Sequence, residues 1–144
     1  MKTTFVNTHK LERKWYVFDA KDQVLGRFST MIANKLRGKD KPSFSPNHDN
    51  GDYVIIINAD KVKVTGSKET QKTYYRHSKY AGGLKSITLD KLRDKNPEKI
   101  IFESIKGMIP RNRLRKDILL KLKIYSGENH PHEAQQAINL NDHE

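Results

Sequence analysis

Three groups of side chains in this sequence could do chemistry, and the first is a run of cations. Arg111, Arg113, Arg115 and Lys116 stand within six positions, directly after the stretch KGMIP. Like charges this close repel one another and destabilise a compact chain unless a partner neutralises them. A helix predicted to start here offers free backbone N–H groups to a phosphate, and arginine adds paired hydrogen bonds. A nucleic-acid backbone explains both features better than an ordinary solvated helix face.

The second group is a stretch in which aromatic residues alternate with cations. The sequence KTYYRHSKYAGGLK contains Tyr74, Tyr75, Arg76, His77 and Tyr80 among its lysines. Aromatic rings stack on splayed bases while cations meet phosphates, a combination that suits RNA more than a uniform duplex. The paired glycines Gly82 and Gly83 would let the backbone come close to a phosphate chain. A strand whose tyrosines pack on the core is the alternative interpretation.

The third group contains the histidines. His130 and His132, with Glu128 and Glu133, could bind a metal or act as acid and base, but a proline separates the histidines in a polar tail. This pattern favours a surface or RNA-contacting turn over a zinc site. His48 and Asp49 could serve a nuclease, although nothing in their spacing pairs them. We therefore expect no metal, no cofactor and no catalytic residue.

Enzyme motifs are missing elsewhere too. Gly66-Ser67-Lys68 resembles a phosphate loop only superficially, because the order of Lys and Ser is wrong and Lys61 stands where the first glycine belongs. No dinucleotide-binding, nucleophile-elbow or zinc-protease motif occurs. The chain has no cysteine, which excludes disulfides and thiolate metal sites. We expect a protein that is not an enzyme; an RNA-processing or nucleotide-dependent enzyme on a doubly wound sheet is the alternative.

Composition supports a nucleic-acid partner. The 144 residues carry a net charge of +11 and have a pI near 9.8, and a pI above about 9 is typical of nucleic-acid binders. No apolar run approaches the roughly 18 residues of a membrane span, and the start, MKTTFVNTHK, lacks the apolar region of a secretory signal. We expect a cytoplasmic protein with no membrane partner.

The elements that would position these residues begin with a β-α-β unit. WYVFDA (residues 15–20) predicts a strand, residues 24–37 a helix that Gly38 ends, and YVIIIN (residues 53–58) a strand buried on both faces. Residues 38–52, rich in turn formers, predict an exposed loop. The sequence therefore predicts one α/β domain over residues 1–144, with residues 1–14 as an N-terminal extension.

The second half predicts a basic hairpin and three helices. Residues 62–65 and 73–76 would pair around the basic tip GSKETQK, and Thr88 would cap a short helix. Asn96 and Pro97 would start a helix with Ile100, Ile101, Ile105 and Met108 on its buried face. A last helix would use Leu114, Ile118, Leu119 and Leu122, followed by the strand LKIYSG. Residues 128–144, with four acids and no Lys or Arg, predict an extended acidic tail.

Five blocks, in this order, carry a resemblance to a known family: WYVFDAKDQVLGR, INADKVKVTGSK, YYRHSKYAGGLK, KGMIP and KLKIYSGENHPHEAQ. Together they resemble the bacterial large-subunit ribosomal protein family conventionally numbered thirteen (the universal uL-thirteen family). The resemblance runs from about Trp15 to Gln135. It implies a three-layer α/β/α domain around a mostly parallel sheet.

The resemblance also implies a function and partners. A member would be a structural constituent of the large (50S) ribosomal subunit that binds 23S ribosomal RNA through basic loops and helix starts, early in subunit assembly. It would be a monomer within the ribosome, beside neighbouring large-subunit proteins, with messenger RNA as a further candidate partner. With the arginine cluster, the expected RNA contacts are Lys63, Lys68, Tyr75, Arg76, His77, Gly82, Gly83, Lys85, Lys106, Arg111, Arg113, Arg115, Lys116, Lys121, Lys123, His130 and His132.

The chain departs from the family pattern, as the resemblance implies it, in two loops and in the tail. The proline common near Ala137 is missing from the tail, and in the first loop Ala81 replaces a proline. Members often have a glycine where Lys79 stands, so this loop is more basic here. After Pro110 many members read Lys-Gly-Pro-Leu-Gly, whereas this chain reads Arg-Asn-Arg-Leu-Arg. The departure after Pro110 adds charge and removes turn formers.

Overall fold

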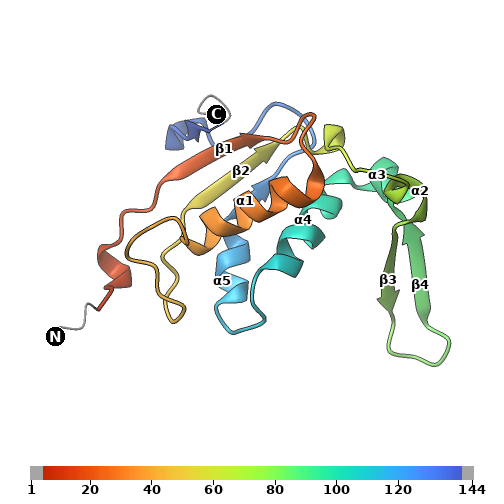
Figure 1. Cartoon of the computed structure of the whole chain (residues 1–144), viewed down its shortest axis with the longest axis horizontal. Helices are drawn as coiled ribbons and strands as arrows, with labels where there is room; N and C mark the ends of the chain where they lie inside the picture. Colours follow the sequence, from red (N-terminus) through yellow and green to blue (C-terminus); the bar gives the residue numbers. More distant parts are fainter. Residues whose placement is uncertain (1–4, 141–144) are drawn as a thin grey trace.

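The computed structural model describes residues 5–140 and contains one main sheet, a separate two-stranded arm and five α-helices within that range (Figure 1). The strands are β1 (Trp15–Asp19), β2 (Tyr53–Ile57), β3 (Thr73–His77), β4 (Leu84–Thr88), β5 (Leu122–Ile124) and β6 (Ile138–Asn139). The helices are α1 (Leu25–Arg37), α2 (Lys68–Gln71), α3 (Leu89–Lys95), α4 (Pro97–Met108) and α5 (Arg115–Leu120). Short 3₁₀ turns lie at η1 (Thr8–Lys10), η2 (Ala59–Lys61) and η3 (Glu133–Gln135).

The main sheet has the order β5-β2-β1-β6, and every pairing in it is parallel. β1 and β2 pair in register from Trp15 with Tyr53 to Asp19 with Ile57, and α1 connects them. The predicted β-α-β unit and the α/β class around a mostly parallel sheet are therefore confirmed. Among residues 5–140, none of the helices combines the length and apolar composition that a membrane crossing requires.

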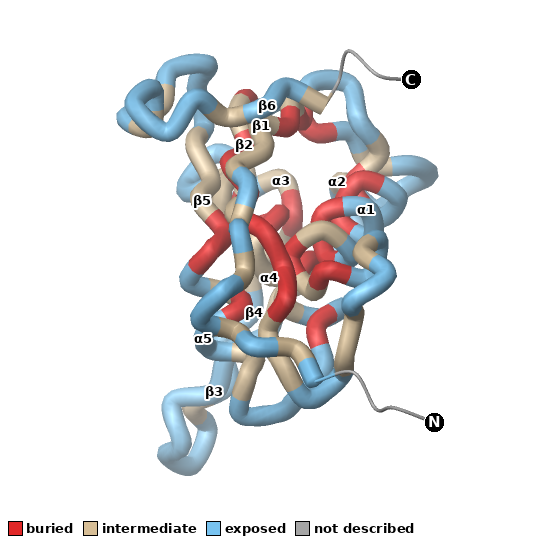
Figure 2. The backbone as a smooth tube through the Cα atoms, turned by 90° about the vertical axis from the view of Figure 1, so that its left-hand side faces the viewer, coloured by how far each residue is buried: buried red, intermediate tan, exposed pale blue. Residues whose placement is uncertain are grey.

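One face of the sheet packs on α1 and α4, and most of the core lies there (Figure 2). Phe28, Ile32 and Leu36 of α1 are buried because they recur at helical spacing on one side. Gly38 ends α1 as predicted, in a left-handed conformation with φ of 75°. Asn96 caps α4 by accepting a hydrogen bond from the Lys99 N–H.

On the opposite face, the C-terminal segment lies against aromatic side chains of β1 and β2. Trp15 and Tyr53 stack with ring centroids 4.3 Å apart, and the His132 ring lies 5.5 Å from Trp15. Beyond them β6 pairs with the free edge of β1, where an unpaired strand offers backbone donors and acceptors. The structure thus differs from the expected extended tail up to residue 140, and residues 141–144 lie outside the described residues.

The predicted pairing of the two hairpin strands is wrong. β3 does not pair with residues 62–65 but with β4, around the loop that contains Gly82 and Gly83. Val62 and Val64 alternate because they pack on the core, and Lys63 forms a parallel bridge to Val24. The expected tip GSKETQK instead contains the helical turn α2.

Two apolar positions also differ from expectation. Met108 is 38% exposed, whereas Ile109, which follows α4, is 2% exposed and supplies the expected apolar contact. Leu122 belongs to β5 rather than to the last helix, because α5 ends at Leu120.

The loop of residues 38–52 is less exposed than predicted, because its end packs under α1. Asn50, Gly51 and Asp52 are buried, and a Cβ added at Gly51 would lie 1.7 Å from the Leu36 carbonyl oxygen. One atom of that clash is a backbone carbonyl oxygen and the other a Cβ, whose position the backbone fixes. Side-chain rotation therefore cannot relieve the clash. Glycine at this position sets how closely the loop approaches the helix.

Replacing Gly51 with alanine should therefore destabilise the fold by about 3 kcal/mol or more, in the range of severe single substitutions. Gly107→Ala is the matched control, because nothing lies within 4 Å of a Cβ there and the position is helical. The control should gain roughly 0.5–1 kcal/mol from the lower backbone entropy of the unfolded chain. Urea unfolding measures the free energy of unfolding of both variants, and equal changes in that free energy would contradict the close packing at Gly51.

Candidate nucleic-acid interface

The arm formed by β3 and β4 projects from the α/β body, and Figure 1 shows it standing apart from the main sheet. Its register pairs Tyr75 with Ser86 and Arg76 with Lys85. Because successive side chains of a strand point to opposite faces, Arg76 and Lys85 share one face with Tyr74 and Ile87. Tyr75, which is 69% exposed, lies on the other face.

The root of the arm is fixed by one guanidinium. Arg93 of α3 binds both carboxylate oxygens of Glu69 in α2 at 2.8 and 2.9 Å. It also donates to the carbonyls of Asp60 and Val62, each at 2.9 Å. The chain enters the arm from α2 and leaves it into α3, so these bonds hold the two ends of the arm together.

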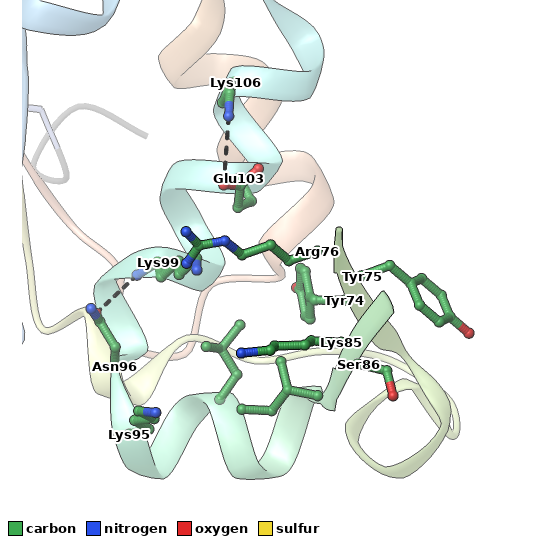
Figure 3. Close-up of a pocket in the computed structure, with 12 residues that line it drawn as sticks. Tyr74, Tyr75, Arg76, Lys85, Ser86, Lys95, Asn96, Lys99, Glu103 and Lys106 are labelled. Carbon is green, nitrogen blue, oxygen red and sulfur yellow. Dashed lines mark hydrogen bonds and ion pairs between the residues drawn. The ribbon is translucent and has the colours of Figure 1, made fainter. Parts of the chain in front are cut away.

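A groove of about 520 Å³ lies between the inner face of the arm and helices α3 and α4. Figure 3 shows Arg76 and Lys85 reaching into it while Tyr75 points away. The charged lining consists of Arg76, Lys85, Lys95, Lys99 and Lys106 with a single carboxylate, Glu103. That carboxylate lies 3.6 Å from the Lys106 ammonium, and the other four cations have no ion pair within the described chain. We call this feature the cationic groove.

The floor of the cationic groove is apolar. Tyr74, Ile87 and Leu92 line it beneath the charged groups, and Tyr74 is half-buried against the core. Burial raises the pKa of the Tyr74 hydroxyl, and the negative charge of Glu103 raises it further. The tyrosine therefore remains neutral well above physiological pH.

The tip of the arm is a tight loop between His77 and Leu84. Lys79 adopts a left-handed backbone with φ of 70°, which costs a side-chain-bearing residue about 1–2 kcal/mol. Gly83 is required by close approach, since a Cβ there would lie 2.9 Å from the Tyr80 carbonyl oxygen and nearer still to Ser78. Lys79 and Tyr80 are exposed at this tip, Tyr80 by 80%.

The arginine cluster divides into exposed and anchored members. Arg111, Arg113 and Lys116 are exposed. Arg115 is half-buried and donates to the carbonyl oxygen of Lys106, so it ties α5 to the end of α4. Arg111 and Arg113 stand in the α4–α5 connection, which points toward the same side of the body as the arm tip in Figure 1, and Lys116 stands in the first turn of α5.

Lys121 does not belong to the exposed surface, which corrects its place among the expected RNA contacts. The residue is 3% exposed, and its ammonium donates to the Leu36 carbonyl at 3.0 Å and to the Asp49 carboxylate. Burial lowers the pKa of Lys121, while the hydrogen bond and charge of Asp49 oppose that shift. This cation stabilises the loop of residues 38–52 and is not available to a phosphate.

Two expected contacts lie outside the arm. Lys63 pairs with Asp22 at 2.7 Å, and this hydrogen bond and charge lower the pKa of the exposed Asp22 carboxyl. Lys68 is exposed at the start of α2, near the root of the arm. The sequence predicts Lys63 in a hairpin strand and Lys68 at the hairpin tip, but neither lies in the hairpin that the structure contains.

The histidine turn is packed against aromatic side chains. The Nε2 atom of His132 lies 2.7 Å from the Tyr125 hydroxyl, and the His132 N–H donates to Nδ1 of His130 at 3.2 Å. His48 instead meets the ring of Phe5 edge-on at 5.1 Å. No three His, Cys, Asp or Glu side chains gather into a metal-binding group among residues 5–140.

Sequence reasoning missed Lys95 and Lys99. They stand on either side of the α3–α4 junction and reach the cationic groove only because the arm lies opposite them. Their separation of four positions gave no signal, because Asn96 and Pro97 interrupt any single helical face between them. Only the placement of the arm brings them together with Arg76 and Lys85.

Comparison with known proteins places this chain in a family. The family model described as "Ribosomal protein L13" matches residues 13–131. The chain belongs to the ribosomal protein L13 family. It is 53% identical over 141 residues to the "Large ribosomal subunit protein uL13" of Citrifermentans bemidjiense, covering 98% of this chain and 99% of that protein. It is 56% identical over 138 residues to the protein of the same name from Streptomyces avermitilis, covering 96% and 94%.

Four of the five sequence blocks that carried the resemblance to the L13 family correspond to defined parts of the fold. WYVFDAKDQVLGR forms β1 and enters α1, and YYRHSKYAGGLK forms most of the arm. KGMIP ends α4, while KLKIYSGENHPHEAQ contains β5 and the histidine turn. The blocks that carried the resemblance therefore include both the sheet and the projecting cationic elements.

Lys121→Met should destabilise the protein by roughly 3–5 kcal/mol, because it leaves Asp49 largely buried without its closest cation. Lys123→Met is the matched control on the next strand: Lys123 is half-exposed and forms no ion pair in the described chain. The control should change the free energy of unfolding by less than about 0.5 kcal/mol. Denaturant unfolding measures the free energy of unfolding of both variants. A Lys121→Met protein as stable as the wild type would contradict the structural role of Lys121.

Proposed function

We propose that this protein is a structural constituent of the large ribosomal subunit and binds 23S ribosomal RNA. One observation carries the proposal: Arg76, Lys85, Lys95, Lys99, Arg111 and Arg113 are exposed cations without an ion pair in the described chain. A dense polyanion is the partner that makes such a surface favourable. The L13-family relatives are named large ribosomal subunit proteins, which supports ribosomal RNA as that polyanion.

The proposal includes a role early in subunit assembly, in the cytoplasm. The α/β body has its own core, and the proposed RNA-facing cations lie on its outside. Such a chain needs no other protein to build its RNA-binding surface. Neighbouring large-subunit proteins, and messenger RNA as a further partner, belong to the same proposal.

The alternative of an RNA-processing enzyme has less support. His130 and His132 are engaged with one another and with Tyr125, and His48 lies against Phe5. None of the three stands in the cationic groove. The histidines that could act in catalysis therefore lie outside the groove proposed to hold RNA, so we propose a binding protein that is not an enzyme.

Arg111→Gln combined with Arg113→Gln should reduce incorporation into large subunits, because each exposed arginine neutralises phosphate in the proposed complex. The change should leave thermal unfolding unaltered, since neither side chain has a partner within the described chain. Tagged wild type and variant, expressed together, compete for subunits that are then isolated on a sucrose gradient and quantified by mass spectrometry.

Lys10→Gln combined with Lys39→Gln removes the same charge from exposed positions outside the arm and the α4–α5 connection. If this control competes as poorly as the arginine variant, net charge rather than the arginine segment governs incorporation. Wild-type protein absent from large subunits would refute the proposed function itself.

A further inference from the structure

We propose that the cationic groove is a binding site for one unpaired RNA strand, held by its phosphates between the arm and helices α3 and α4. The inference rests on the proposed function and gives it a defined ligand: single-stranded rather than duplex RNA. It also separates this site from the arginine segment of the α4–α5 connection, whose exposed cations do not line the groove.

The arrangement of charge on two facing walls favours a strand. Arg76 and Lys85 reach in from the arm, whereas Lys95, Lys99 and Lys106 come from α3 and α4 (Figure 3). A chain of phosphates lying between the walls would be contacted from both sides. A duplex presents a convex surface with its phosphates on the outside, so it would meet the rims of the groove and leave the cations inside unneutralised.

The size and floor of the groove fit a nucleotide chain better than a lone anion. Its volume of about 520 Å³ lies within the roughly 300–1,000 Å³ of sites that enclose small organic ligands. Tyr74, Ile87 and Leu92 form the apolar floor, which suits a base or ribose, while the cations stand where phosphates would run. Aromatic and apolar surface beside a cationic track is the usual construction of single-strand sites.

The groove is also held open in advance. Arg93 fixes the root of the arm through its bonds to Glu69 and to the carbonyls of Asp60 and Val62. The Leu89 N–H adds a bond of 2.9 Å to the Lys72 carbonyl across the same root. Cations that repel one another are thereby kept on facing walls, so a strand can bind without first assembling the site.

The test uses the full-length protein and a fluorescent single-stranded oligoribonucleotide of about ten nucleotides, within the roughly 4–16 that one single-strand domain covers. Anisotropy titrations at several salt concentrations are repeated with a blunt RNA duplex of the same length. Lys95→Gln combined with Lys99→Gln removes two groove cations that form no ion pair in the described chain. Lys21→Gln combined with Lys39→Gln is the control, because both residues are exposed and outside the groove.

The groove variant should bind the single strand about tenfold or more weakly. The slope of log affinity against log salt should become shallower by about 1.4, because each single-strand phosphate contact contributes roughly 0.7. Its duplex affinity, and both affinities of the control, should change by no more than about twofold. The inference would be overturned if the groove variant and the control lost affinity for the single strand equally. It would also be overturned if the groove variant lost affinity for the single strand and for the duplex equally.

Adding ATP distinguishes a strand from a free nucleotide. A control with salt of the same ionic strength shows how much of the displacement is due to salt alone. Displacement of the oligoribonucleotide by ATP beyond that of the salt control would show a mononucleotide site and overturn the strand assignment. Failure here is separable from failure of the proposed function. A wild-type protein that enters large subunits but shows no groove-dependent strand binding would refute only the groove, whereas absence from subunits would refute only the ribosomal role.

Discussion

Arg93 stands where the two ends of the arm meet the α/β body, and its guanidinium makes four hydrogen bonds there. Two go to the Glu69 carboxylate, and the others reach the carbonyls of Asp60 and Val62. A lysine could not replace it, because one ammonium cannot present this planar fork of donors. The position of the arm, and with it the spacing of cations across the groove, depends on this residue.

The basic residues of this chain serve two opposite physical purposes. Lys121 and Arg13 pair with Asp49 and fix the loop of residues 38–52 to the body, while Lys41 pairs with Asp52 within that loop. Four of the five lining cations of the groove are exposed and have no ion pair in the described chain, so they remain mutually repulsive until an anion arrives. Net charge alone cannot distinguish these groups, although one stabilises the fold and the other is proposed to bind RNA.

Local patterns predicted the elements that local physics determines. The spacing of Phe28, Ile32 and Leu36 indicated α1, and the Asn96–Pro97 pair indicated where α4 begins. The apolar run after Tyr53 indicated a buried parallel strand, and β2 is confirmed in that place. Each of these signals depends on residues that are neighbours along the chain.

The misplaced features depend on contacts between distant residues. Val62 and Val64 alternate like strand residues, but the core rather than a partner strand fixes them. Lys121 and Lys123 are indistinguishable by type and spacing, and only the tertiary packing of Gly51 and Asp49 buries the first. β6, two residues long, forms because β1 offers it a free edge. The groove itself exists only where the arm faces α4.

Chemical acetylation of lysines, read by mass spectrometry, tests the central claim that the groove side of the protein faces RNA. Free protein and purified large subunits are treated alike, and each lysine is compared between the two. The account predicts that Lys85, Lys95 and Lys99 react in the free protein and become protected in the subunit, while buried Lys121 stays unreactive in both. Equal reactivity of the three groove lysines in free protein and subunit would contradict it.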